Sequence, residues 1–362
     1  MISKKPFLVT LIVFCAFSSF AQIGGVGVYQ FLNLPVSSRT SALGGVLNCV
    51  KDDDVTLAIQ NPALLNPSMD NHFEISYINY IAGVNFGTVA YARTFDSAGK
   101  KGTFIAGMQY INYGTIIQAD DVGNVLGTFT PGEYNYFLGY GRQWRRFSYG
   151  AQLKFIYSSL ASTYTSIGLA MDLGGFYASK DGDFTTALVL RNMGVEVKPY
   201  DVTREPLPFE VQGGISERLK HLPLRVSVIL QHLEVFDMSY INTNAPVQTD
   251  LTTGQPIIQT VSLSQKIAEH FIFAGELMPG KNFFIRFGYN YQRRVELTIP
   301  NDAGFVGFSY GFGFKISKFN ISYGRAAYHI SAASNTFTIT TNFSDFYKRV
   351  DKGEDGKETP AP

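Results

Sequence analysis

One serine lies in a pattern that could support ester hydrolysis. Residues 307–311 read G-x-S-x-G around Ser309, which is the nucleophile signature of α/β-hydrolases. The chemistry requires a strand that breaks into a sharp turn and then a helix, so that the serine hydroxyl stands clear of the sheet. His329, on the next predicted strand, is the one candidate base. An esterase that uses Ser309 is therefore one hypothesis.

The residues around Ser309 show no such break. Apolar side chains at every second position from 306 to 316 alternate with small or polar residues. A period of two predicts a β-strand with two unlike faces. We therefore interpret Ser309 as a strand residue that faces the interior between two glycines, and we expect no catalytic residue and no enzyme activity.

Histidines and acidic residues give no metal-binding pattern. The five histidines, at positions 72, 221, 232, 270 and 329, lack ligand spacing. The acidic groups at 52–54, 119–121 and 181–183 lack the twelve-residue calcium loop with its closing glutamate. We expect turns and solvated loops there, and neither a metal site nor a cofactor.

The N-terminus resembles a secretory signal peptide. Lys4 and Lys5 precede an apolar run at 6–17 and small residues at 19–21, so we expect residues 1–21 to be a signal peptide that is cleaved near Ala21. Removing both lysines leaves 28 basic against 29 acidic residues, a formal charge of −1. A balance this close to neutral does not favour a nucleic-acid partner. Cys49 is then the one remaining cysteine and forms no internal disulfide.

Composition and periodicity predict an all-β fold, a transmembrane antiparallel β-barrel. Charged residues make up only 16% of the chain, which holds 30 Phe and 21 Tyr. About fourteen segments alternate over roughly ten residues, the length that a tilted strand needs to cross a bilayer. Four segments are clear, and ten weaker ones follow the same rule. The clear segments are 147–157, 166–173, 283–292 and 306–316, and the weaker ones are 73–81, 85–95, 103–113, 133–142, 184–192, 207–216, 224–233, 270–278, 319–330 and 335–344.

The connections and charges orient the predicted barrel. Short turns alternate, imperfectly, with longer loops, as in outer-membrane barrels, and strand parity places both termini in the periplasm. Charged residues collect in the small or polar register, so the Phe and Tyr face meets lipid. Arg325 breaks this rule, so we expect it to lie at a strand end or past a bulge. We expect the barrel at 72–346 and a flexible periplasmic tail at 347–362.

Residues 22–71 precede the first strand and lack its alternation, so we expect a hatch, or plug, folded into the barrel. The sequences YQFLNLPVSSRTSALGG (29–45) and NPALLN (61–66) resemble the start of the PorQ family of the type IX secretion system. More broadly, they are similar to the hatch of FadL-like barrels, which include PorV. The matching positions are Arg39, Ala42, Leu43, Gly44, Gly45, Asn61, Pro62 and Ala63.

The resemblance implies a 14-stranded FadL-like barrel in the outer membrane with an N-terminal hatch, in which the matching residues pack the hatch. It also implies a structural role in an attachment complex with PorU, PorV and PorZ. That complex cleaves the C-terminal signal of secreted cargo and fixes the product to lipopolysaccharide, with the chemistry on PorU. The alternative is a FadL-like channel for hydrophobic small molecules.

The longest predicted loop, at 234–268, is our candidate for partner contact. It carries apolar residues that a solvated loop does not need, namely Tyr240, Ile241, Pro256, Ile257 and Ile258. The loops at 114–132 and 193–206 are the next candidates.

Overall fold

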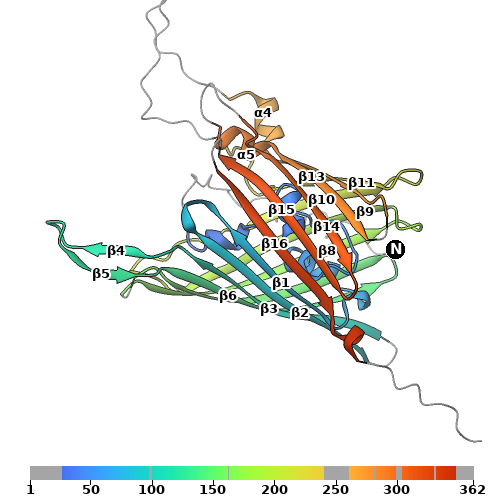
Figure 1. The fold of residues 1–362 in the computed structure, drawn as a ribbon, viewed down its shortest axis with the longest axis horizontal. Coiled ribbons are helices and arrows are strands. Elements are labelled where there is room, and N and C mark those ends of the chain that lie inside the picture. The colour runs from blue at the N-terminus through green and yellow to red at the C-terminus, as the bar shows by residue number, and fades with distance from the viewer. Residues whose placement is uncertain are drawn as a thin grey trace, which may run out of the picture.

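A computed structural model describes residues 27–97, 100–161, 163–239, 261–280, 282–298, 304–329 and 332–347. The predicted signal peptide and almost all of the predicted tail lie outside these residues. Within the described ranges, fourteen antiparallel strands form a closed barrel, in which β1 pairs with β16 (Figure 1). The predicted fold class is confirmed.

Neighbours along the chain are neighbours in the wall throughout, apart from the insertion between β3 and β6. The wall strands are β1 (His72–Asn79), β2 (Asn85–Ser97), β3 (Lys100–Asn112), β6 (Gly132–Trp144), β7 (Phe147–Ser159), β8 (Thr165–Ala178), β9 (Phe184–Lys198), β10 (Glu210–Arg218), β11 (Leu224–Leu230), β12 (Phe271–Leu277), β13 (Phe283–Asn290), β14 (Phe308–Ile316), β15 (Phe319–His329) and β16 (Ala332–Asn342).

Local chemistry explains where strands end earlier than the alternation predicts. β11 stops before His232, whose backbone has a positive φ of 53°. β13 stops at Asn290, whose side chain accepts a hydrogen bond from the Arg293 backbone N–H and caps α5 (Tyr291–Glu296). β14 starts after Gly307, where φ is +86°. The apolar alternation continues through these residues although the strands do not.

Two short strands and two short helices outside the wall were not predicted. The connection between β3 and β6 forms a separate two-stranded sheet of β4 (Ile116–Ala119) and β5 (Val125–Phe129). Helix α4 (Leu263–Ala268) precedes β12, and α5 follows β13. Among the described residues, no helix is both long and apolar enough to cross a membrane.

The two faces of the wall differ as the alternation predicts. Outward side chains such as Leu153 and Phe287 are 61% and 59% exposed, while the inward Lys154 and Arg286 are buried. Rings on the outer face contact across strands, and Phe283 stacks on Phe314 with centroids 4.9 Å apart. An outward apolar band is the surface that hydrocarbon favours.

Arg325 is an exposed exception near the end of β15. Its Nη1 donates to Asn335 Oδ1 at 3.0 Å, and the β15–β16 register shifts between Ala327 and His329. The register shift follows Arg325, so Arg325 lies near the strand end and not past a bulge.

The chain before β1 runs through the inside of the barrel from one end to the other. It contains η1 (Gln30–Asn33), α2 (Ser38–Ala42), α3 (Val55–Gln60), η2 (Pro62–Leu64) and η3 (Pro67–Met69). At the end with the longer connections, the Val28 N–H donates to Pro206 O at 3.1 Å. At the end with the short turns, Lys51 Nζ donates to Ser148 Oγ at 2.6 Å. The start of β1 lies at the short-turn end, where strand parity places it. Gly27, the first described residue, lies at the opposite end, with the longer connections.

Side-chain caps define the short hatch helices. The Ser37 side chain and Thr40 form a capping box at the start of α2, and the Asp54 side chain accepts from the Thr56 N–H at the start of α3. Asn61 caps η2, with Pro62 at its first position. Helices of five and six residues are not stable alone, so contact with the wall must hold them. We call residues 27–69 the hatch.

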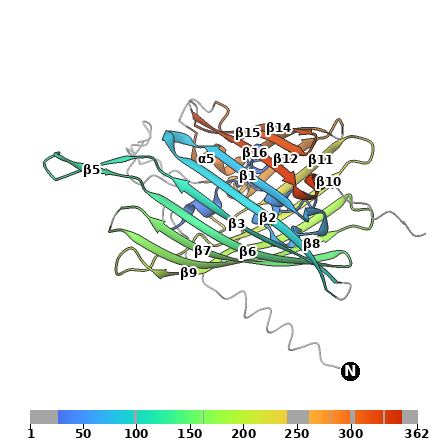
Figure 2. The same ribbon diagram turned by 60° about the horizontal axis from the view of Figure 1, so that its bottom comes forward.

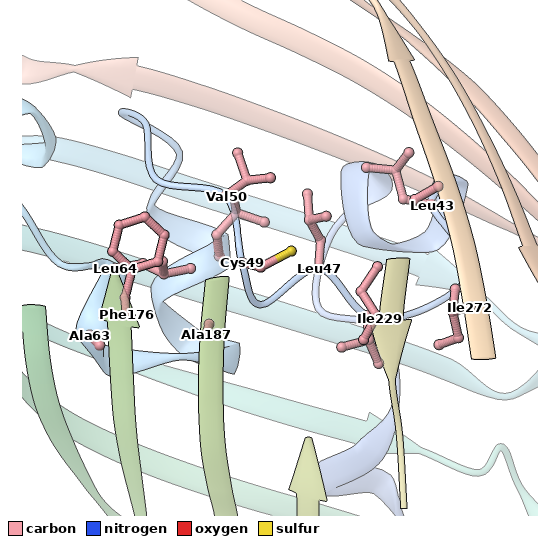
Figure 3. Packing of buried hydrophobic residues seen from close by; sticks show 13 residues of the cluster. Leu43, Leu47, Cys49, Val50, Ala63, Leu64, Phe176, Ala187, Ile229 and Ile272 are labelled. Atoms are coloured by element: carbon pink, nitrogen blue, oxygen red, sulfur yellow. The ribbon is translucent and has the colours of Figure 1, made fainter. Parts of the chain in front are cut away.

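Apolar side chains join the hatch to the wall. Figure 3 shows Leu43, Leu47 and Cys49 of the hatch packed toward Ile229 and Ile272 of β11 and β12. These side chains are fully buried. The lumen is therefore filled by protein along this part of the barrel.

Candidate functional site in the hatch and the barrel lumen

Arg39, the first of the predicted hatch residues, ties α2 to the barrel wall. Its guanidinium forms a two-pronged ion pair with Glu276 of β12, with Nε to Oε1 at 2.8 Å and Nη2 to Oε2 at 2.9 Å. It also contacts Asp52 at 2.8 Å and Asp54 at 3.1 Å, both in the hatch. Burial alone lowers the pKa of Arg39, but Asp52, Glu276 and Asp54 outweigh it and hold the pKa well above its ordinary value.

Two wall arginines complete the cluster around Arg39. Arg286 Nε lies 3.1 Å from Glu276, and Arg225 Nη1 lies 3.4 Å from Glu276 and 3.7 Å from Asp52. The three arginines face the three carboxylates of Asp52, Asp54 and Glu276, so the formal charges cancel. We call these six residues the ion cluster. Buried charges persist only when paired in this way.

A polar cavity of about 330 Å³ opens beside the ion cluster at the short-turn end of the barrel. Besides the cluster residues, Asp53, Lys315 and Lys318 line it. The hatch therefore lies above a small polar cavity on this side.

The predicted residues Ala42 to Gly45 form the turn that ends α2 against the wall. Gly44 and Gly45 have φ angles of +90° and +111°, which favour glycine. The wall is equally tight, because a Cβ on Gly288 of β13 would lie 2.3 Å from the Gly44 nitrogen. Leu43 is fully buried. A Cβ on Gly311 of β14 would lie 2.7 Å from the Ala42 Cβ. Close backbone approach explains the A-L-G-G sequence.

Asn61, Pro62 and Ala63 form a second close contact with β7 and β8. Asn61 Nδ2 donates to Asn48 O at 2.8 Å, and its Oδ1 accepts from the Ala63 N–H at 3.0 Å. A Cβ on Gly150 would lie 2.3 Å from Pro62 O. The eight predicted hatch residues thus lie at hatch turns and hatch-to-wall contacts along the barrel.

Ser309 binds the hatch. Its hydroxyl donates to Ala42 O at 3.0 Å and accepts from the Gly44 N–H at 3.0 Å. Ser309 lies within the regular register of β14, opposite Gly288 and Ala326. It is 3% exposed and follows no nucleophile elbow, so its hydroxyl serves the hatch turn.

The acidic groups that the sequence singled out are also engaged. Asp52 and Asp54 belong to the ion cluster, and Asp120 Oδ1 accepts from the Val122 and Asn124 N–H groups in a turn. Asp181 contacts Lys220 at 3.0 Å. Across the described ranges, no group of three or more His, Cys, Asp or Glu side chains is placed to hold a metal ion.

The long-loop half of the lumen holds an apolar cluster, which sequence reasoning missed. Phe31 and Leu32 of the hatch are buried against inward-facing wall residues and one loop residue. We call residues 28–34 the arm, and the apolar residues beneath it the nest. The nest consists of Ile78, Phe86, Ile111, Ile156 and Leu207. Phe86 and Ile111 belong to the inward register of adjacent strands, which the alternation alone could have indicated.

The arm is attached by few polar contacts. Arg191 Nη2 donates to Leu32 O at 2.8 Å, and Asn192 Nδ2 donates to Asn33 Oδ1 at 2.9 Å. The Tyr29 hydroxyl is hydrogen bonded to Ser166, which donates to Glu196 Oε1 at 2.7 Å. No ion pair of the described residues holds the arm, whereas the ion cluster holds α2.

The predicted partner-contact residues Tyr240, Ile241, Pro256, Ile257 and Ile258 lie outside the described residues. The other two loops are described. The 114–132 connection carries the β4–β5 sheet, and β9 extends to Lys198 within the third predicted loop.

Comparison with known proteins gives structural relatives only. No protein-family model and no curated protein matches the sequence. The Pseudomonas putida toluene transporter TodX aligns over 86% of this chain and 99% of that chain, with a TM-score of 0.51 and 12% identity. A TodX monoaromatic hydrocarbon channel deltaS2 mutant aligns over 86% and 98%, with a TM-score of 0.51 and 11% identity. A Pseudomonas aeruginosa FadL homologue aligns over 88% and 100%, with a TM-score of 0.44 and 9% identity. The likeness to TodX shows that the barrel has the fold of an outer-membrane channel.

Proposed function

We propose that this chain is an outer-membrane channel for hydrophobic small molecules. The observation that carries the proposal is the apolar nest, which faces the lumen and is covered by the arm. A channel for water-soluble solutes has a polar lumen. An apolar cluster covered by an apolar peptide instead suits a solute that replaces the contacts of Phe31 and Leu32.

Unequal attachment of the hatch supports the same function. The ion cluster and the turn at Gly44 and Gly45 fix α2 to the wall, whereas hydrogen bonds and apolar contacts hold the arm. An incoming apolar solute competes with apolar contacts and does not compete with ion pairs. We therefore infer that the arm moves while α2 stays in place. The toluene transport named for TodX fits this solute class.

Uptake of a monoaromatic hydrocarbon tests the proposal. Cells with an outer membrane but no hydrocarbon channel of their own are given this gene, and entry of radiolabelled toluene is timed. We expect faster entry with the chain than without it. Phe86→Ser makes the nest polar and should reduce the gain, whereas Phe104→Ser changes an outward-facing phenylalanine that is 40% exposed and should retain it.

Both variants must fold for the comparison to hold, and a heat-modifiable band on a gel checks for a folded barrel. Equal entry with and without the wild-type chain contradicts the channel function. A loss of entry in Phe104→Ser as large as in Phe86→Ser contradicts the role of the nest.

A second candidate is the scaffold of the type IX attachment complex, with PorU, PorV and PorZ as partners and lipopolysaccharide as the final acceptor. The sequence pattern at 39–45 and 61–63 favours it. These residues contact the wall, which is a role they would have in any barrel with this hatch. They are therefore stronger evidence for the fold than for membership of the attachment complex. Deletion of the gene should leave cargo unattached and its C-terminal signal uncleaved. Normal cargo processing in the deletion strain would rule this candidate out.

A further inference from the structure

The β4–β5 sheet exposes more apolar side chains than a solvated loop requires. Ile117, Val122, Val125 and Leu126 are 63% to 85% exposed, and Ile116 is 43% exposed. β4 and β5 pair only with each other. An isolated two-stranded hairpin is marginally stable in water, and contiguous exposed apolar groups mark interaction sites. We call residues 115–130 the ribbon.

The ribbon lies beyond the membrane on the long-loop side. It continues the β3–β6 pair, with the Tyr113 N–H donating to Pro131 O at 3.1 Å at its base. Figures 1 and 2 show it projecting past the end of the barrel. A 13-residue strand such as β3 is about 43 Å long and, tilted by about 40°, covers about 33 Å, which already exceeds the hydrocarbon thickness of about 30 Å. Acyl chains therefore do not reach the ribbon.

Charge excludes lipopolysaccharide as the occupant. The sequence from 114 to 131 contains no Lys, Arg or His, and its only charges are Asp120 and Asp121 at the tip. Phosphate groups bind most strongly to basic side chains, and two aspartates repel them. The tip instead complements a basic surface.

The edge of β5 is unprotected. Edge strands of soluble proteins carry charges, prolines or covering segments that prevent pairing with another chain. β5 has the sequence VLGTF and holds no charge and no proline. Two copies in one membrane would point their ribbons in the same direction and bring their Asp120 and Asp121 side chains together, and like charges repel. A second copy is therefore a poor occupant.

We propose that the ribbon is the docking site for an extracytoplasmic protein that pairs its own sheet edge with β5 and receives Val125 and Leu126 in an apolar groove. Basic residues of that partner face Asp120 and Asp121. This inference goes beyond channel function and stands without it.

Site-specific cross-linking tests the proposal. Leu126→Cys is labelled with a benzophenone maleimide in cells that naturally make the protein, then irradiated, and the adducts are identified by mass. Cys49 is fully buried and does not compete for the label. Leu222→Cys, 56% exposed at a short turn on the opposite end, is the matched control.

We expect one extracytoplasmic protein to cross-link to position 126 and not to position 222. With that protein purified, amide exchange at 125–129 should slow at least tenfold on binding, and Leu126→Asp should abolish the effect. Toluene entry should be unchanged in Leu126→Asp, which separates this inference from the channel function. An adduct with lipid only, with a second copy only, or with nothing would overturn the proposal, as would the same adduct from both positions.

Discussion

Replacing Arg39 by Met should release the hatch from the wall. The substitution keeps an unbranched apolar side chain and removes the guanidinium with its charge. Arg39 is 92% buried at the side chain and forms the only described ion pair of Asp54, while Glu276 keeps Arg286 and Arg225 as partners. The variant therefore leaves the two hatch carboxylates short of positive charge inside the barrel.

The expected cost follows from this geometry. Removing one partner of a buried ion pair costs about 3 to 5 kcal/mol. Because Glu276 retains two arginines, we expect the lower end, about 3 kcal/mol, in the free energy of hatch opening. Since about 1.4 kcal/mol is a factor of ten, the open hatch should become about a hundredfold more populated.

Cys49 provides the assay. Its thiol is fully buried in the hatch, and burial raises its pKa to about 12, so it reacts with a maleimide only when the hatch opens. We expect Arg39→Met to speed labelling of Cys49 by about a hundredfold in the folded barrel. Arg93→Ala removes an exposed arginine 3.8 Å from Asp70, and an exposed pair contributes at most about 1 kcal/mol, so it should change the rate by less than about fivefold.

Labelling of Arg39→Met at the wild-type rate would refute the reasoning, because the ion cluster would then contribute nothing to closure. Equal acceleration in Arg93→Ala would show that the label reports general loosening of the barrel and not opening of the hatch.

Three further predictions concern single contacts. Gly288→Ala should destabilise the hatch by about 1 to 3 kcal/mol and speed Cys49 labelling, because the new Cβ would meet the hatch backbone. Gly275→Ala places its Cβ in open space and should leave Cys49 labelling unchanged. Ser309→Ala should speed that labelling by breaking two hydrogen bonds while leaving any ester hydrolysis unaltered, and a loss of hydrolysis would contradict its structural role. Burial alone lowers the pKa of His232, but Glu210, Glu234 and Glu296 outweigh it and raise the pKa to about 9, so its stabilising effect is complete below pH 6.5 and is lost as pH rises through 9. Protection of the Leu233 amide from hydrogen exchange should be complete below pH 6.5 and should decrease as pH rises through 9. His232→Gln should remove this pH dependence.

The wall could be predicted from the sequence because its physics is local. A strand with lipid on one side and a packed lumen on the other needs alternation at every second residue, and most of the fourteen strands show it, although β9 breaks it at Asn192, where φ is 55°. The ends of β11, β13 and β14 were missed because backbone conformation and capping at His232, Asn290 and Gly307 stop the pairing while the apolar pattern continues.

The lumen could not be predicted in the same way. Arg39 and Glu276 are separated by 237 positions, and no local pattern pairs them. The helices of the hatch are five and six residues long, too short for a helical period to be visible. The sequence did indicate an N-terminal segment folded into the barrel, but the nest appears only when distant strands are brought beneath the arm.

Disulfide trapping tests most directly the claim that the hatch fills a closed barrel. Ser38 Oγ of α2 and Ser322 Oγ of β15 lie 2.6 Å apart, although 284 positions separate them. A variant with Ser38→Cys and Ser322→Cys should form an intramolecular disulfide in the folded protein, close enough for the normal geometry, and reduction should shift its gel mobility. If both thiols stay free in the folded, heat-modifiable barrel under oxidising conditions, the hatch does not lie against β15 and the account is wrong.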